Sequence, residues 1–184
     1  MTMKGFLAFL IGCVAFAAFA QVRVSNSTGS VETMNKVKPG MGVNSQDRRY
    51  FAEAKLMTVY CMRLSEIASR QSGGWVQKFG SAMLKDHVQN YGEIKVIGSK
   101  IGIKVDKQLP AAWQKPIDRL KATSGSSFER EFQRLYIGAK NLFAEQTERE
   151  IKLGNNSLVR NFAVTASPVT SLQIKMAKRK ISKI

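Results

Sequence analysis

Histidine and cysteine are scarce in this 184-residue chain, which has one histidine, His87, and two cysteines, Cys13 and Cys61. A dinuclear metal site in a helical bundle uses two histidines, usually in Glu-x-x-His pairs, and a closed zinc site needs four ligands. The chain contains no Glu-x-x-His and no Cys-x-x-Cys-His for covalent haem attachment. We therefore expect that the protein holds no metal and no cofactor.

Sequence signatures of catalysis are missing as well. Gly-x-Ser-x-Gly, phosphate-binding loops and glycine-rich dinucleotide loops do not occur. Cys61 lies on the apolar stripe of a helical segment, where a thiol is by default a small apolar group and not a nucleophile. These absences favour a protein that is not an enzyme.

Acidic residues are few, with 13 Asp and Glu against 29 Lys and Arg, and Glu150 is the last of them. Residues 151–184 carry seven basic residues and no acid. Such a field attracts polyanions, so we expect contact with an anionic envelope polymer or lipid surface; a solvated basic face is the alternative. Nucleic acid is a weaker candidate, because no recognition motif accompanies the charge. The candidate binding residues are Lys175, Lys178, Arg179, Lys180 and Lys183.

The N-terminus is the one long apolar stretch. Lys4 precedes an apolar run of 16 residues, shorter than the roughly 20 that a spanning helix needs. Ala18 and Ala20 form a small-residue exit, so residues 1–20 resemble a secretory signal cleaved after Ala20. Lipid modification at Cys13 is an alternative, since Leu10-Ile11-Gly12-Cys13 resembles a lipoprotein box. We expect an exported protein, periplasmic or associated with the outer membrane.

Strand patterns are nearly absent after Ser45, where apolar residues instead recur every three or four positions. Gly, Ser, Asn and one Pro punctuate residues 21–44, which show no regular apolar period and predict a flexible leader. Residues 45–184 predict one all-α domain, an up-and-down four-helix bundle with a short crossover helix. The expected helical segments are 45–71, 75–100, 111–123, 127–153 and 157 onward. Ser45 is the expected N-cap of the first. Within the third, the helix is expected to start at Pro116, and the last is expected to break at Ser167-Pro168.

Polar residues interrupt the inward stripes. His87 and Asn90 lie on the apolar line of the second helix, Asp86 lies at its edge, and Gln173 lies on the inner line of the last helix. A lone polar core residue fixes the packing of neighbouring helices. We therefore expect His87 to bond Gln173 or a backbone carbonyl, and a ligand role is the alternative.

Several segments spread over about 47–180 carry a family resemblance. They include Leu64-Ser-Glu-Ile-Ala68, Met83-Leu-Lys-Asp86-His87, Gly125-Ser-Ser-Phe128-Glu, and Phe162-Ala163 followed by Pro168. With them the chain resembles a bacterial exported family catalogued as a domain of unknown function and often labelled "predicted outer membrane protein". The resemblance implies a ferritin-like four-helix bundle.

The resemblance also implies inward polar positions that this chain has changed. Where the family places a glutamate and two histidines, the matching residues here are Cys61, Lys140 and Gln173. The expected inward cluster is thus Asp86, His87, Asn90, Lys140 and Gln173, with Lys140 either reaching solvent at the bundle edge or pairing with Asp86. The main hypothesis is a binding or structural envelope protein. The alternative is a degenerate metal- or cofactor-binding protein with a stress-related role.

Overall fold

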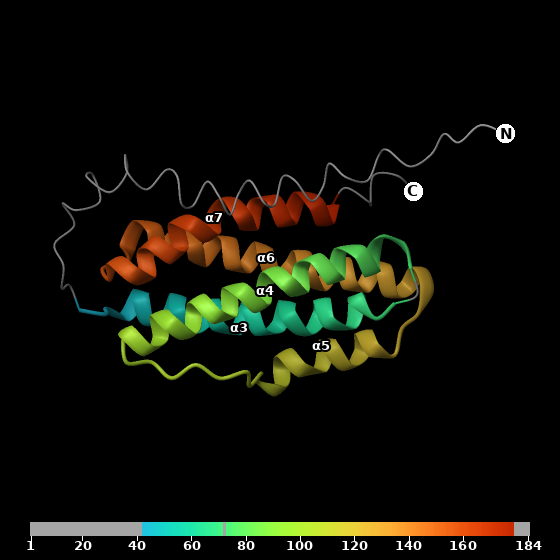
Figure 1. Ribbon diagram of the computed structural model, residues 1–184, viewed down its shortest axis with the longest axis horizontal. Coiled ribbons are helices and arrows are strands. Elements are labelled where there is room, and N and C mark those ends of the chain that lie inside the picture. The colour runs from blue at the N-terminus through green and yellow to red at the C-terminus, as the bar shows by residue number, and fades with distance from the viewer. Residues whose placement is uncertain (1–41, 72, 179–184) are drawn as a thin grey trace. The chain divides into compact units, whose positions relative to one another are not determined.

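The computed structural model describes residues 42–71 and 73–178, and within them the chain is all-helical, without a strand (Figure 1). The expected signal peptide, most of the expected leader, and Arg179, Lys180 and Lys183 lie outside these residues. The described helices are α3 (Ser45–Ser69), α4 (Gly74–Lys100), α5 (Ala111–Lys121), α6 (Gly125–Leu153) and α7 (Ser157–Lys178). The prediction of an all-α domain is confirmed.

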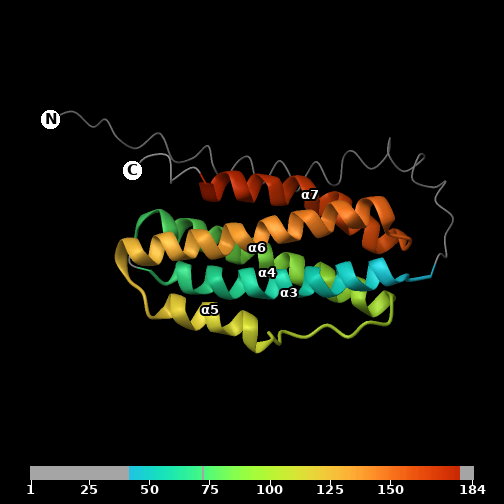
Figure 2. The same cartoon turned by 180° about the vertical axis from the view of Figure 1, so that it is seen from behind.

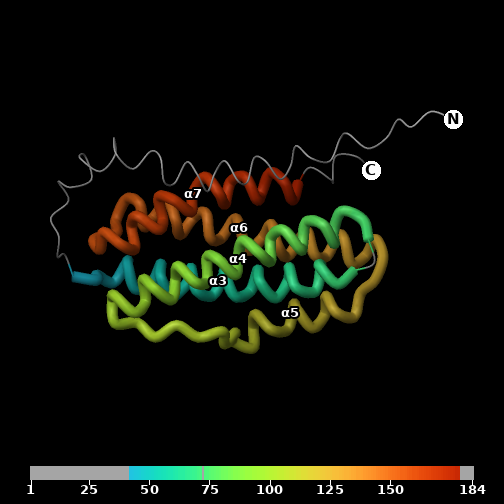
Figure 3. The backbone as a smooth tube through the Cα atoms, in the orientation of Figure 1, coloured from blue at the N-terminus to red at the C-terminus, as the bar shows by residue number. Residues whose placement is uncertain are grey.

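Short turns pair the long helices. α3 packs on α4 and α6 packs on α7, and a contact between α3 and α6 joins the two pairs. Residues 101–110 run without helix from the end of α4 to α5 (Figure 3). The two opposite views show α5 and α7 on opposite sides of the layer that α3 and α6 form (Figures 1 and 2). α5 attaches through buried Ile117 and Leu120 and through Trp113, whose ring centroid lies 4.9 Å from that of Tyr60.

Aromatic rings fill the space between α4 and α6. Phe79 of α4 contacts the rings of Phe132 and Tyr136 of α6, with centroids 6.0 and 5.2 Å apart in edge-on geometry. Trp75 stacks on Phe79, and Phe128 stacks on Phe132. Burying each such ring stabilises the fold by roughly 1.5–3 kcal/mol relative to exposure. These rings place α4 opposite α6 across the core.

The first helix begins one residue earlier than expected. Asn44, not Ser45, is the N-cap: its side chain accepts from the amide of Asp47 at 2.8 Å, and the Asp47 carboxylate accepts from the amide of Asn44 at 2.7 Å. This reciprocal pair satisfies amides that a helix start leaves unpaired. Gly42 also accepts a hydrogen bond, from Asn155 Nδ2. The last residues assigned to the leader, 42–44, therefore belong to the domain.

Two predicted helix boundaries at prolines are wrong. α5 starts at Ala111 and contains Pro116, and α7 runs unbroken through Pro168 to Lys178. A proline inside a helix removes one amide donor, which leaves the carbonyl four residues earlier without its partner. Here those residues, Ala112 and Val164, are exposed, so water can hydrate the free carbonyl. A third boundary also differs, because α6 starts at Gly125, two residues before the expected Ser127.

Candidate functional site

His87 lies at the centre of the domain, on the buried line of α4. Its side chain is fully buried, and Nε2 is 3.0 Å from the hydroxyl of Tyr136 on α6. The other ring nitrogen, Nδ1, has no hydrogen-bond partner among the described residues. Burial, assisted by the charge of Lys140, lowers the pKa of His87 well below its ordinary value. The imidazole is therefore neutral at physiological pH.

Asp86 joins α4 to α7 instead of facing the centre directly. Gln173 Nε2 donates to its Oδ2 at 3.2 Å, and the Oε1 atom of Gln173 is buried with no partner in the described part of the chain. Burial raises the pKa of Asp86, while the bond from Gln173 and the charge of Lys140 oppose that rise. The sequence predicted the inward position of Gln173, but its partner is Asp86 and not His87.

Lys140 is buried on α6, with 5% of its surface exposed. Its Nζ lies 5.8 Å from the ring centroid of Tyr136 and 5.7 Å from that of Phe143. Burial lowers its pKa, while Cys61 and Asp86 raise it. Lys140 thus neither reaches solvent nor forms a direct ion pair with Asp86 in the described structure; aromatic faces stabilise its charge, as in other cation–π contacts.

Cys61 of α3 completes this centre from the opposite helix. It is fully buried, and burial raises the pKa of its thiol to about 11 although Lys140 opposes the rise. The protonated thiol is not a nucleophile at neutral pH. Asn90, one turn after His87, is only half-buried and forms no hydrogen bond to the other members of the expected cluster.

The central residues do not fit a metal site of the kind that helical bundles hold. No group of three or more His, Cys, Asp and Glu comes together within residues 42–71 and 73–178. Lys140 brings positive charge to the centre, and the Asp86 carboxylate is engaged by Gln173. A cationic, ligand-poor centre opposes binding of a divalent ion.

A second polar cluster, which sequence reasoning missed, lies where α3 begins and α6 ends. Asp47 is fully buried, and its Oδ1 accepts from the amides of Asn155 and Asn156 at 2.9 and 3.0 Å. These bonds lower the pKa of Asp47 against the effect of burial. The sequence signal was the acid in the first turn of α3, but nothing in the sequence identified its distant partners.

Glu150 adjoins Asp47 and is also fully buried. Burial, together with a side-chain hydrogen bond to Asp47 and the charge of Asp47, raises the pKa of Glu150 to about 7. Gln46 Nε2 donates to Oε2 at 3.4 Å, and Oε1 has no partner within the described residues. Below its pKa of about 7, Glu150 is therefore mainly protonated, while the lowered pKa of Asp47 keeps that neighbour ionised.

The basic residues of α7 are the described part of the expected anionic-surface site. Lys175 and Lys178 are exposed, and α7 contains no acid. Arg160, near its start, is half-buried. Two of the five expected binding residues are thus available at the surface, and the structure does not describe the other three.

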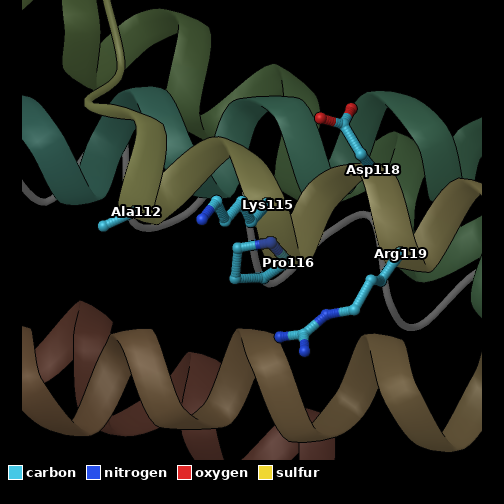
Figure 4. A pocket seen from close by; sticks show the side chains of 5 residues that line it. All are labelled: Ala112, Lys115, Pro116, Asp118 and Arg119. Atoms are coloured by element: carbon cyan, nitrogen blue, oxygen red, sulfur yellow. The ribbon is translucent and has the colours of Figure 1, made fainter.

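A surface pocket of about 580 Å³ lies beside α5, lined by Ala112, Lys115, Pro116, Asp118 and Arg119 (Figure 4). Asp118 is already engaged by Gln114 and Lys121, at 2.9 and 3.1 Å. The Arg119 side chain extends towards α6, where its charge lowers the pKa of Glu131 together with Arg134. The only acid among these lining residues is thus engaged by neighbours on its own helix.

Comparison with known proteins gives one match. A family model described as "Domain of unknown function (DUF4142)" matches residues 32–179. No curated protein and no solved structure matches the chain. The match spans all five described helices.

Proposed function

The chain belongs to the family described as a domain of unknown function (DUF4142), a description without an activity, and we propose that it is an exported, non-enzymatic cell-envelope protein that binds an anionic partner through α7. The observation that carries this proposal is the charge of α7. The helix has three basic residues and no acid, and it leads into Arg179, Lys180 and Lys183 in the sequence. Cations collected on one face attract anionic polymers and membranes.

The proposed location, periplasmic or at the outer membrane, is supported by residues 1–20, with their single lysine, apolar run and Ala-x-Ala end. Cell fractionation combined with the N-terminal sequence of the purified protein tests it. A chain beginning at Gln21 supports export with cleavage. A lipid-modified Cys13 supports the lipoprotein alternative, and an uncleaved chain in the cytoplasm contradicts export.

The binding proposal is tested by co-sedimentation with anionic vesicles and by binding to soluble polyphosphate, each at low and high salt. Because each cation near an anionic surface contributes about 1 kcal/mol, Lys175→Glu/Lys178→Glu should weaken binding at least tenfold. Added salt should weaken it too, since ions screen exposed charges.

The matched control is Lys95→Glu/Lys104→Glu, which changes net charge equally at exposed positions on α4 and the loop after it. This control should retain most of the binding. Equal losses in the two variants would show that net charge, and not α7, determines binding. If the protein did not bind these anionic partners, or bound them equally at low and high salt, the proposed role of α7 would be wrong.

We further propose that α3, α4, α6 and α7 form a ferritin-like four-helix bundle, with α5 as the crossover. The strictly up-and-down order expected from the sequence is wrong, because the crossover lets α4 and α6 run in the same direction (Figure 1). The lengths of these helices and their pairing through short turns support it, as does the position of α5 on the outside of α3. An experimental structure tests it. A structure in which the four long helices do not pack around one common core would contradict it.

The alternative proposal, a degenerate metal- or cofactor-binding protein with a stress-related role, is favoured by one observation. His87 Nδ1 is buried and has no hydrogen-bond partner among the described residues, and a buried unpaired nitrogen costs stability unless something binds it. Elemental analysis and an absorption spectrum of protein purified without a metal-binding tag test it. Stoichiometric metal or a haem band that disappears in His87→Ala would replace the main proposal with this one.

A further inference from the structure

The outer face of α7 carries an apolar stripe. Val164 and Leu172 are 44% and 43% exposed, and Pro168, also exposed, lies between them at four-residue spacing. Residues four apart on a helix lie on the same face, so the three form one line. The opposite side of α7 is buried in the core through Val159, Phe162, Ala163, Thr170, Gln173 and Ala177. The stripe therefore faces away from the rest of the domain.

Basic residues continue this stripe towards the C-terminus. Lys175 follows Leu172 by three residues on the same face, and Lys178 lies one turn further, both exposed. Since α7 has no acid, no charge of its own opposes an anion here. A helix with exposed apolar residues and cations on one face is typical of helices that lie in a membrane interface.

The charge and the apolar residues of this face together distinguish a lipid surface from other occupants. No described helix is long and apolar enough to cross a bilayer, so the face would lie on a membrane and not span it. A second copy of the chain would bring a formal net charge of +16 against the same charge, whereas anionic lipid complements it. A soluble polyanion, in turn, would use the lysines and leave the apolar stripe exposed.

We propose that the outer face of α7 binds the surface of an anionic phospholipid bilayer. Val164, Pro168 and Leu172 enter the boundary between headgroups and acyl chains, and Lys175 and Lys178 pair with lipid phosphates. This inference rests on the proposed function, and it specifies lipid, rather than a soluble polymer, as the anionic partner.

The test compares three probes: vesicles of phosphatidylglycerol and phosphatidylcholine, vesicles of phosphatidylcholine alone, and soluble polyphosphate. Val164→Gln/Leu172→Gln removes apolar character without changing charge. It should weaken binding to the anionic vesicles at least fivefold and leave polyphosphate binding unchanged, because only a bilayer accepts apolar side chains. Lys175→Glu/Lys178→Glu should weaken both, and vesicles of phosphatidylcholine alone should bind weakly.

The matched control is Val88→Gln/Val96→Gln, which changes two exposed valines of α4, 52% and 56% exposed. All variants alter surface positions, so their helical circular dichroism should match that of the unmodified protein. Vesicle binding unaffected by Val164→Gln/Leu172→Gln, or lost equally in the control, would overturn the lipid inference while salt-sensitive polyphosphate binding upheld the proposed function. Absence of binding to every probe would defeat both.

Light scattering addresses a second copy of the chain. A monomer in the absence of lipid is expected. A dimer that Val164→Gln/Leu172→Gln converts to monomer would show that the stripe is a protein interface and would overturn the lipid assignment.

Discussion

Of the two ring nitrogens of His87, only Nε2 has a hydrogen-bond partner among the described residues, the hydroxyl of Tyr136. Because the imidazole is neutral and fully buried, it cannot recover a lost hydrogen bond from solvent. The pair joins α4 to α6 at a level where apolar rings otherwise fill the core. This hydrogen bond fixes the relative position of α4 and α6, because any shift that separates His87 Nε2 from the Tyr136 hydroxyl leaves both polar groups buried and unpaired.

Tyr136→Phe should destabilise the protein by about 1–3 kcal/mol, the usual cost of leaving a buried polar group unpaired. His87→Leu/Tyr136→Phe should be less destabilised than the sum of its two single variants, because removing both partners leaves no orphaned nitrogen. Urea unfolding followed by circular dichroism gives the free energy of unfolding of the unmodified protein, the two single variants and the double variant. Additive effects would show that the hydrogen bond contributes no coupling.

Glu150 makes stability depend on pH. Its pKa is about 7 in the folded protein and 4.5 in its ordinary state, so folding favours the protonated acid. The stabilisation is complete below pH of about 4.5 and is lost as the pH rises through about 7. The groups that act on Glu150 are Asp47 and Gln46 of α3, through hydrogen bonds, and Arg160 of α7, through its charge. Burial and the charge of Glu150 in turn raise the pKa of Tyr50.

Glu150→Gln should abolish this dependence, since glutamine resembles the protonated acid and stays neutral. Melting temperatures of the two proteins should be similar at low pH, and the variant should be the more stable one at pH values above the pKa of about 7. A series of thermal melts across this window measures the difference. Parallel curves for the two proteins would contradict the assignment.

At the scale of the helix, α3 and α4 approach each other closely at Gly80. A Cβ atom there would lie 2.6 Å from Cβ of Ala68 and 2.7 Å from the backbone nitrogen of Ser69. Because backbone cannot yield as a flexible side chain can, even alanine would force the helices apart. Gly80 therefore sets the distance between the two helices.

Gly80→Ala should lower stability by about 1–3 kcal/mol, the range for overpacking a core. Gly92→Ala on the same helix is the control: nothing lies within 4 Å of its Cβ, so the substitution should stabilise by roughly 0.5–1 kcal/mol through helix propensity. Thermal unfolding of the two variants and of the unmodified protein measures both changes in stability. A stable Gly80→Ala would mean that the close contact can relax.

Helices were readable from the sequence because their apolar spacing is regular, but their ends at prolines were not. Pro116 and Pro168 lie inside helices, and the residues four positions before each of them are exposed, so water can replace the missing amide donors. Leu142 of α6 is 49% exposed although it is apolar and follows two buried residues, Ala139 and Lys140, closely along the helix. Whether a helix face is covered depends on the neighbouring helix, which periodicity alone does not locate.

For the whole molecule, the inward positions of His87, Lys140 and Gln173 could be predicted, but their partners could not. Tyr136 gave no signal, because a tyrosine on an apolar stripe resembles core. Glu150 resembled a surface acid at the end of a helix. Both acquire their roles from residues far away in the chain, such as His87 and Asp47, and a single sequence does not contain those distances.

Cys61 reports on the stability of the whole domain, because it is fully buried among the helices and its thiol has a pKa of about 11. Labelling by a thiol reagent should require unfolding, so its rate should rise with urea in parallel with the loss of helical circular dichroism. The unfolded protein in high urea gives the reference rate. Rapid labelling under native conditions would show that the centre opens locally.

Asp47 accepts hydrogen bonds from amides 108 and 109 positions later in the chain. Closing so long a loop costs entropy before any contact compensates it, whereas the α3–α4 and α6–α7 hairpins need only short loops. We therefore expect the two hairpins to assemble first and the Asp47 carboxylate to dock onto the α6–α7 turn last. In the reverse direction, we expect the start of α3 and that turn to be the first parts of the domain to separate.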